Sequence, residues 1–356
     1  MANPTQQLHQ AGQSLWLDNI TRKLLDDGTL VDYRDRLSVT GLTSNPSIFD
    51  KAIGSGDDYK DAIKASRKTD PEQIFFDLAI DDLRRAAKIF EPVHTRTAGV
   101  DGWVSLEVSP LLADDTDGTV AQAVELHARA ATSNLYIKVL GSAAGIGAIE
   151  ELIYRGVPIN VTLLFSPAQY QAAAEAWMRG VERRIAANMN PDVPSVASIF
   201  ISRWDVKVAP KTPPDLHNRI GLAVASSAYV RYCSLLASAR MHRLLNAGAR
   251  PQRLLWASTS TKDPKASDVL YVENLYAPFT INTIPGKTLL DYADHGTLKP
   301  AMSTDDTAAR AELERFAKLD LHVDALGAQL QDEGAAAFSK SWQDLLGTIK
   351  QCMESK

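Results

Sequence analysis

Strand-like and helix-like segments alternate along this chain, which limits what it can fold into. Short runs rich in branched or aromatic residues, most bounded by Gly, Pro, Asn or Asp, are typical of β-strands. They are residues 14–19, 38–44, 103–108, 135–140, 159–165, 195–202, 254–259 and 281–285. Between them apolar residues return every three or four positions, which indicates helices at Gly118–Ala131, Gly145–Arg155 and Pro167–Ala187. The alternation predicts an α/β fold, a closed (β/α)8 TIM barrel, with a doubly wound open sheet as the alternative.

The length of the chain leaves room for additions to such a barrel. A (β/α)8 barrel takes about 250 residues, whereas this chain has 356. Further helical patterns occur near residues 57–98 and 205–248 and in a tail near residues 306–356. No Pro/Gly/Ser-rich linker separates them, so we expect one domain over residues 1–356 with helical insertions.

Charge and composition exclude some classes of binding partner. The 38 basic and 43 acidic side chains give a net charge of −5 and are dispersed, which argues against nucleic acid as a partner. No apolar run approaches the ~18 residues of a membrane span, and the first residues do not resemble a signal peptide, so a cytoplasmic location without membrane contact is expected. Cys233 and Cys352 lie far apart and the histidines are dispersed, so no metal site is expected.

Side-chain alternation predicts which polar groups face the barrel interior. In residues 135–140, Leu135, Ile137 and Val139 form a helix-facing set, which sends Lys138 inward. The same argument sends Ser105, Glu107, Asn160, Thr162, Ser198, Phe200, Trp16 and Asp18 inward, with Leu163 and Phe165 among the helix-facing residues. Thr43 and Asn45 share one parity. Several strands thus deliver polar residues near their carboxyl ends, where barrel active sites lie.

Lys138 is the central member of this set. Lysine is almost never fully buried without a reason, and burial disfavours its charged form. A neutral amine is a nucleophile that forms a Schiff base with a carbonyl. A structural ion pair with Glu107 or Asp18 is the alternative, but two carboxylates among further polar groups favour catalysis because they supply the proton transfers.

Three segments resemble the transaldolase family. They are GLTSNPSIF at residues 41–49, LYIKVLGSAAGIGAIEELIYRGVPINVTLLFSPAQY at residues 135–170 and SIFISRWD at residues 198–205. The length and the stretch LLWASTSTKDP at residues 254–264 are similar to the bacterial type with long helical insertions. The matching segments run from about Trp16 to Pro285.

The resemblance implies an eightfold α/β barrel and a transferase of the pentose phosphate pathway that needs no cofactor. Such enzymes move a dihydroxyacetone unit from sedoheptulose 7-phosphate to glyceraldehyde 3-phosphate, giving erythrose 4-phosphate and fructose 6-phosphate. The implied partners are sugar phosphates, and both a monomer and a homodimer stay open.

The resemblance also implies roles for individual residues. Lys138 would form the Schiff base, Asp18 would be the acid/base at the breaking bond, and Glu107 with Thr162 would hold the water used in dehydration. The implied substrate contacts are Asn45, Asn160, Ser198, Phe200 and Arg203, the last being a phosphate ligand, and Thr43 is a further candidate beside Asn45.

Two departures from the family pattern concern the phosphate ligands. Where many members read S-P-F-V-G-R, this chain has Ile199 and Ser202 in place of the proline and the glycine before Arg203. A second arginine expected after the seventh strand is absent, and Lys262 is the substitute that we predict. As a point charge, it lacks the two-pronged geometry of arginine.

Three rival functions remain open. A fructose 6-phosphate aldolase that releases free dihydroxyacetone is the nearest, although its pattern replaces the Glu107 carboxylate with an amide. Gly141, Gly145 and Gly147 follow a strand and open a helix, which resembles the nucleotide-binding turn of short-chain dehydrogenases. A non-catalytic barrel is the third, but it would have no reason to keep Lys138 together with two carboxylates.

Overall fold

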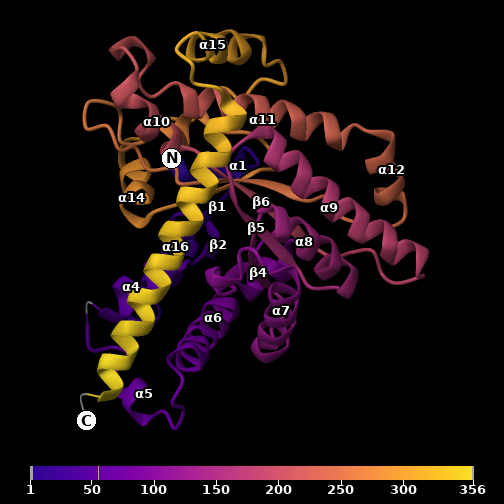
Figure 1. Ribbon diagram of the computed structural model, residues 1–356. Helices are drawn as coiled ribbons and strands as arrows, with labels where there is room; N and C mark the ends of the chain where they lie inside the picture. The colour runs from indigo at the N-terminus through magenta and orange to yellow at the C-terminus, as the bar shows by residue number, and fades with distance from the viewer. Residues whose placement is uncertain (1–2, 55, 355–356) are drawn as a thin grey trace.

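All eight predicted strands are present in one parallel sheet that curls into a barrel (Figure 1). The computed structural model describes residues 3–54 and 56–354. The strands are β1 (Ser14–Asp18), β2 (Val39–Thr43), β3 (Val104–Glu107), β4 (Leu135–Leu140), β5 (Ile159–Leu164), β6 (Ser195–Phe200), β7 (Arg253–Ala257) and β8 (Ile281–Ile284). Their order around the sheet is β2-β1-β8-β7-β6-β5-β4-β3. Each strand in this order lies beside its neighbours in the chain, and β8 lies beside β1, as in a (β/α)8 barrel.

The two ends of the sheet meet where β2 lies against β3. The Leu42 amide donates to the Trp103 carbonyl oxygen at 3.0 Å, and the Ser44 hydroxyl donates to the Ser105 carbonyl oxygen at 2.8 Å. A Cβ atom on Gly41 would lie only 2.6 Å from the Trp103 carbonyl oxygen, so glycine is needed for this close approach. The TIM barrel prediction is confirmed. The open-sheet alternative is wrong, because the edges that it would leave free contact each other.

The crossover helices begin and end where local signals predict. They include α7 (Thr116–Ala130), α8 (Ala143–Arg155) and α9 (Pro167–Ala186). The Ser166 hydroxyl accepts from the Gln169 amide and the Gln169 side chain binds the Ser166 amide, a capping box that starts α9. Gly156 adopts a left-handed φ of 84° and ends α8.

Further helices lie in the three intervals expected to hold additions. They are α4 (Pro46–Gly54), α5 (Lys60–Ala65) and α6 (Pro71–Arg96), then α10 (Ser202–Val208), α11 (Ile220–Leu236) and α12 (Ala239–Asn246), and finally α15 (Thr307–Ala317) and α16 (Val323–Glu354). The remaining helices are α1 (Pro4–Gln10), α2 (Arg22–Asp26), α3 (Thr29–Arg36), α13 (Leu270–Asn274) and α14 (Gly286–His295), with short 3-10 turns at Pro110–Leu112, Ala209–Lys211 and Pro214–Leu216. That they form one domain with the barrel stays a prediction.

Within the described residues, no single helix is long and apolar enough to cross a bilayer. One pair of helical segments, Pro214–Leu236 with Ala239–Asn246, reaches the required length and composition, although the pair is bent by 58°.

The long helix α16 crosses the face of the barrel from the side of α15 to that of α5 (Figure 1). Its first half contributes Leu330 and Phe338 to an apolar cluster with Phe200 and Trp204. In its second half, the Trp342 ring packs edge-on against Phe75 of α6, with 4.9 Å between ring centroids. The helix therefore joins the barrel to the insertion between β2 and β3.

One predicted alternation is wrong, at the end of β5. The register between β5 and β6 shifts between Val161 and Leu164, and Leu163 takes a left-handed φ of 57°, which costs about 1–2 kcal/mol for a residue other than glycine. Because of this bulge, Leu163 and Phe165 pack in the cluster with Phe200, whereas Leu164 packs on the helix side. The simple two-residue period had placed both on the helix side.

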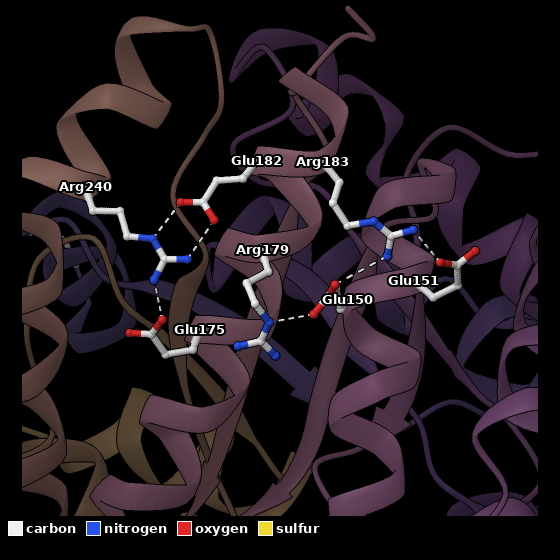
Figure 2. Close-up of polar contacts among 7 residues, drawn as sticks. All are labelled: Glu150, Glu151, Glu175, Arg179, Glu182, Arg183 and Arg240. Atoms are coloured by element: carbon white, nitrogen blue, oxygen red, sulfur yellow. Dashed lines mark hydrogen bonds and ion pairs between the residues drawn. The ribbon is translucent and has the colours of Figure 1, made fainter. Parts of the chain in front are cut away.

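Ion pairs join α8, α9 and α12 on the outside of the barrel (Figure 2). Arg240 of α12 binds Glu175 and Glu182 of α9, and its Nε lies 2.6 Å from the Glu182 carboxylate. Between α9 and α8 lie the pairs Arg179–Glu150 at 2.5 Å, Arg183–Glu150 at 3.4 Å and Arg183–Glu151 at 2.8 Å. We call these residues the outer network. Their side chains are a quarter or more exposed, so each pair lies at the water surface.

Candidate active site

A cavity of about 320 Å³ opens at the carboxyl ends of the strands. All predicted site residues except Glu107 and Asn160 line it, namely Asp18, Thr43, Asn45, Lys138, Thr162, Ser198, Phe200, Arg203 and Lys262. The lining that was not predicted is Ser47, Ile48, Lys51, Ala257, Ser258, Ser260, Thr283, Pro285 and Phe338. Residues from most of the strands, from α4 and from α16 thus converge on one pocket.

Lys138 lies at the floor of this pocket and is only 4 % exposed. Its Nζ donates to the Ser44 carbonyl oxygen at 2.9 Å and lies 3.0 Å from Oε2 of Glu107. Glu107 and Lys138 are direct partners in the β3–β4 register, so the fold itself brings them together. The ion pair that we considered as a structural alternative is therefore present, but it borders a cavity, as a reacting lysine requires.

The two carboxylates flanking Lys138 are held differently. Oδ1 of Asp18 accepts a hydrogen bond from the Thr43 hydroxyl at 2.9 Å, and Thr43 is itself 2.6 Å from the Thr283 hydroxyl. Oε1 of Glu107 has no hydrogen-bond partner among the described residues. Burial raises the pKa of both carboxyls, and the positive charge of Lys138 offsets part of that rise. Both acids hold a proton more readily than a surface carboxylate does, which suits proton transfer.

Asn160 of β5 lies beside Lys138 in the β4–β5 register and binds Ser198 of β6. The Ser198 hydroxyl donates to Oδ1 of Asn160 at 2.7 Å, and Nδ2 of Asn160 donates to the Ser105 hydroxyl at 3.2 Å. Asn160 is fully buried and does not line the cavity, so it reaches the pocket through Ser198. Thr162 does line the cavity, and its hydroxyl has no partner among residues 3–54 and 56–354.

Cations line another part of the pocket. The Arg203 guanidinium lies 5.2 Å from the Phe200 ring centroid and 5.9 Å from that of Phe338. Burial lowers the pKa of Arg203, and burial together with Arg203 lowers that of Lys262. Within the described part of the chain, neither Arg203, Lys262 nor Lys51 forms an ion pair with a carboxylate. Their positive charge is left for a bound anion.

Lys51 is the functional candidate that the sequence analysis missed. It lies on α4, which Asn45 directly precedes, and both residues line the cavity together with Ile48. The spacing of three residues from Asn45 to Ile48 and from Ile48 to Lys51 marks one face of a helix, and this signal could have identified Lys51.

The departure at Ser202 has a local consequence. Its amide donates to the Ser258 carbonyl oxygen at 3.0 Å, and the two hydroxyls are 2.9 Å apart. These contacts tie the start of α10 to the end of β7, and Arg203 follows directly. The missing family glycine therefore does not remove Arg203 from the pocket.

The glycines that resembled a nucleotide-binding turn have packing roles. A Cβ atom on Gly145 would lie 1.8 Å from the Leu140 carbonyl oxygen, and one on Gly141 would lie 2.3 Å from a methyl carbon of Leu164. Ser142 caps α8 by accepting from the Gly145 amide at 3.1 Å. Close packing and a helix cap account for this turn without a nucleotide.

The fold and the site together define the class: a (β/α)8 barrel with a polar pocket at the carboxyl ends of its strands, built around a buried lysine and two carboxylates. The chain belongs to the transaldolase/fructose-6-phosphate aldolase family, whose sequence pattern matches residues 15–349. The family resemblance seen in the sequence is thereby confirmed, and the dehydrogenase alternative is wrong.

Relatives of this chain match it over nearly its whole length. The transaldolase of Thiobacillus denitrificans is 42 % identical over 357 residues, which cover 98 % of this chain and 99 % of that protein. The transaldolase of Thermobifida fusca is 41 % identical, covering 99 % and 98 %, and that of Neisseria gonorrhoeae is 39 % identical, covering 95 % and 97 %. The family description includes two activities, whereas these relatives bear the first name alone.

Proposed function

We propose that this chain is a transaldolase, which transfers dihydroxyacetone from sedoheptulose 7-phosphate to glyceraldehyde 3-phosphate through a Schiff base on Lys138. The products are erythrose 4-phosphate and fructose 6-phosphate. The observation that carries the proposal is the buried Lys138 amine, 3.0 Å from Glu107 at the floor of a cavity that also contains unpaired cations. The full-length similarity to proteins named transaldolase supports it.

The first half of the reaction forms the Schiff base. Lys138 first passes an ammonium proton to the Glu107 carboxylate 3.0 Å away, and the resulting neutral amine attacks the C2 carbonyl of the ketose and gives a carbinolamine. Loss of hydroxide from this adduct requires a proton donor, and a water molecule held by Glu107 and Thr162 relays the proton. The unpartnered oxygen atoms of both side chains fit this role.

The second half breaks and remakes a carbon–carbon bond. Asp18 accepts the C4 hydroxyl proton as the C3–C4 bond breaks, and an aldose phosphate leaves. The protonated imine delocalises the electron pair left on C3, which then attacks the acceptor aldehyde. The raised pKa of Asp18 helps it take and return this proton, while Thr43 keeps the carboxylate oriented.

Substrate binding divides between two parts of the pocket. Asn45 and Ser198 contact the dihydroxyacetone hydroxyls, and Asn160 orients Ser198 from beneath. Arg203 and Lys262 bind the phosphate, with Phe200 beside them, and Lys51 adds a third positive charge. This set needs no metal or organic cofactor for the chemistry described, and we place the enzyme in the cytoplasm with its sugar phosphates.

Borohydride reduction tests the proposal. Incubation with fructose 6-phosphate and borohydride should attach a reduced dihydroxyacetone unit to Lys138, identified by peptide mass. Lys138→Met should abolish the adduct, whereas Lys340→Met, at an exposed lysine of α16, should leave it unchanged. An adduct on another lysine, or none, would refute the assignment.

The lyase alternative is separated by a coupled assay. A transaldolase consumes fructose 6-phosphate only when erythrose 4-phosphate is present as acceptor. Consumption at the same rate without that acceptor would identify an aldolase that releases free dihydroxyacetone.

A further inference from the structure

One face of α16 lies directly over the active site. Gln331, Gly334, Phe338 and Ser341 follow one another at spacings of three and four residues, which places them on one side of a helix. All four are buried or half-buried, whereas Asp332 and other residues between them are exposed. Phe338 lines the cavity, and the Ser341 hydroxyl is 2.7 Å from that of Ser47, another lining residue.

Gln331 on this face binds the ends of two strands at once. Its Nε2 donates to the Gly141 carbonyl oxygen at 3.0 Å and to the Leu163 carbonyl oxygen at 2.9 Å. The Gly141 amide in turn donates to the Thr162 carbonyl oxygen at 2.9 Å. The side chain of Gln331 therefore closes a hydrogen-bonded ring with the backbone that carries Thr162.

The Leu163 carbonyl oxygen that Gln331 binds lies where the pairing of β5 with β6 is irregular. Leu163 is the left-handed residue of the β5 bulge, where the regular β5–β6 register is interrupted. Thr162 precedes it directly, so the direction of the Thr162 hydroxyl depends on this strained geometry. Gly334 lets the helix come close, because a Cβ atom there would lie 3.1 Å from a Leu163 methyl carbon and 3.1 Å from an Arg203 nitrogen.

We propose that Gln331 is a positioning residue for Thr162: it holds the Leu163 carbonyl, and thereby directs the Thr162 hydroxyl at the water used in dehydration beside Lys138. The inference rests on the proposed function, since it assigns a step of that reaction to the water. It makes α16 a working part of the site, although the helix itself supplies none of the reacting groups.

A double-mutant cycle tests this inference. Gln331→Met removes both donors at nearly constant length, and Thr162→Val removes the hydroxyl. The measured quantity is the rate at which the borohydride-trapped adduct with fructose 6-phosphate forms in a single turnover. We expect Gln331→Met to slow this rate about tenfold, as the loss of one or two hydrogen bonds implies, and to add no further loss in the Thr162→Val background.

Two controls separate positioning from loosening of the helix. Gln329→Met removes the neighbouring exposed contact to Glu333 and should leave the rate unchanged. Inorganic phosphate should inhibit Gln331→Met and the parent enzyme equally, because Arg203 is untouched. The inference would be overturned if the losses in rate added in the double mutant. It would also be overturned if phosphate inhibited Gln331→Met about tenfold more weakly than it inhibits the parent enzyme. If the parent enzyme forms no adduct, the proposed function fails instead.

Discussion

The outer network and the pocket around Lys138 contain the same kinds of charged groups, but the pKa values of these groups are shifted in opposite directions in the two places. The pKa of Glu151 is lowered by hydrogen bonds from Arg155, its neighbour on α8, and from Arg183 of the outer network. The Arg240 guanidinium lowers the pKa of Glu182, and Glu182 raises that of Arg240. In the pocket, burial raises the pKa of both carboxyls and lowers that of Arg203 and Lys262. Ion pairing therefore sets the direction of the pKa shifts in the outer network, and desolvation sets it in the pocket.

This contrast separates charges that join helices from charges that line the pocket. On the surface, every acid of the outer network is paired with an arginine. In the pocket, Glu107 is paired with Lys138, whereas Arg203, Lys262 and Lys51 have no acidic partner in the described residues. A buried carboxyl whose ionised form is disfavoured can exchange protons closer to neutral pH than a surface carboxyl does. The predictions below test this division, from the largest expected effect to the smallest.

Replacing Lys138 should have the largest effect. Lys138→Met removes the nucleophile, and turnover should fall by on the order of 10⁴-fold or more. Lys138→Arg keeps the charge beside Glu107 but should be equally inactive, because a guanidinium is not deprotonated in proteins. Initial rates with fructose 6-phosphate and erythrose 4-phosphate measure both. Activity in the arginine variant would mean that Lys138 serves only as an ion-pair partner.

Asp18→Asn should slow carbon–carbon cleavage by about 10²–10⁴-fold while the adduct with Lys138 still forms. The variant should also be more stable above neutral pH. Because the pKa of Asp18 is raised on folding, its ionisation destabilises the folded protein as pH rises through the window between the unfolded and the folded pKa. A gain in melting temperature of about 1–4 °C at pH 8 is expected. Below both pKa values this gain should vanish, and a gain that persists there would contradict the assigned cause.

Lys51→Met and Lys262→Met should each raise KM for the sugar phosphates about tenfold, with little change in kcat, since each removes one charge from the phosphate site. The effect should weaken as salt is added. The exposed lysine variant Lys340→Met is the matched control. Equal losses with an unphosphorylated ketose would show that these lysines do not bind the phosphate.

Arg240→Met should have the smallest effect. It removes two partly exposed ion pairs of the outer network, worth about 1 kcal/mol in total, or about 2 °C in melting temperature. Since the pKa of Glu182 is lowered on folding, the difference from the parent should be present at neutral pH and disappear as pH falls through that lowered pKa. Kinetic constants should not change. A fall in kcat would show that the two regions are coupled.

Much of the fold and site could be predicted because the relevant signals are local. Strand segments are bounded by turn residues, and a period of two residues is enough to send Lys138 and Glu107 to the same side of adjacent strands. That period fails at Leu163, where a bulge reverses the facing of Leu163 and Phe165. Nothing in the run of apolar residues there marks which one takes the left-handed conformation.

The unpredicted part of the site comes from helices that approach from elsewhere. Gln331 and Phe338 lie more than a hundred residues after the strands that they contact. The periodicity of their segment predicts a helix but does not indicate which surface of the protein that helix covers. The sequence also does not show how deep each interior side chain lies below the cavity. Parity places Asn160 and Ser198 alike inside the barrel, but only Ser198 lines the cavity.

The contacts of Lys138 have a consequence for the closure of the barrel. Its ammonium has three N–H donors, and two of them join Ser44, which follows β2, to Glu107 of β3, across the place where the sheet closes. A protonated imine at the same nitrogen has a single N–H and must release at least one of these contacts. On the proposed chemistry, the imine intermediate therefore removes one tie from the seam between β2 and β3. Amide hydrogen exchange at Leu42, whose bond to Trp103 crosses that seam, would report the covalent state of the enzyme.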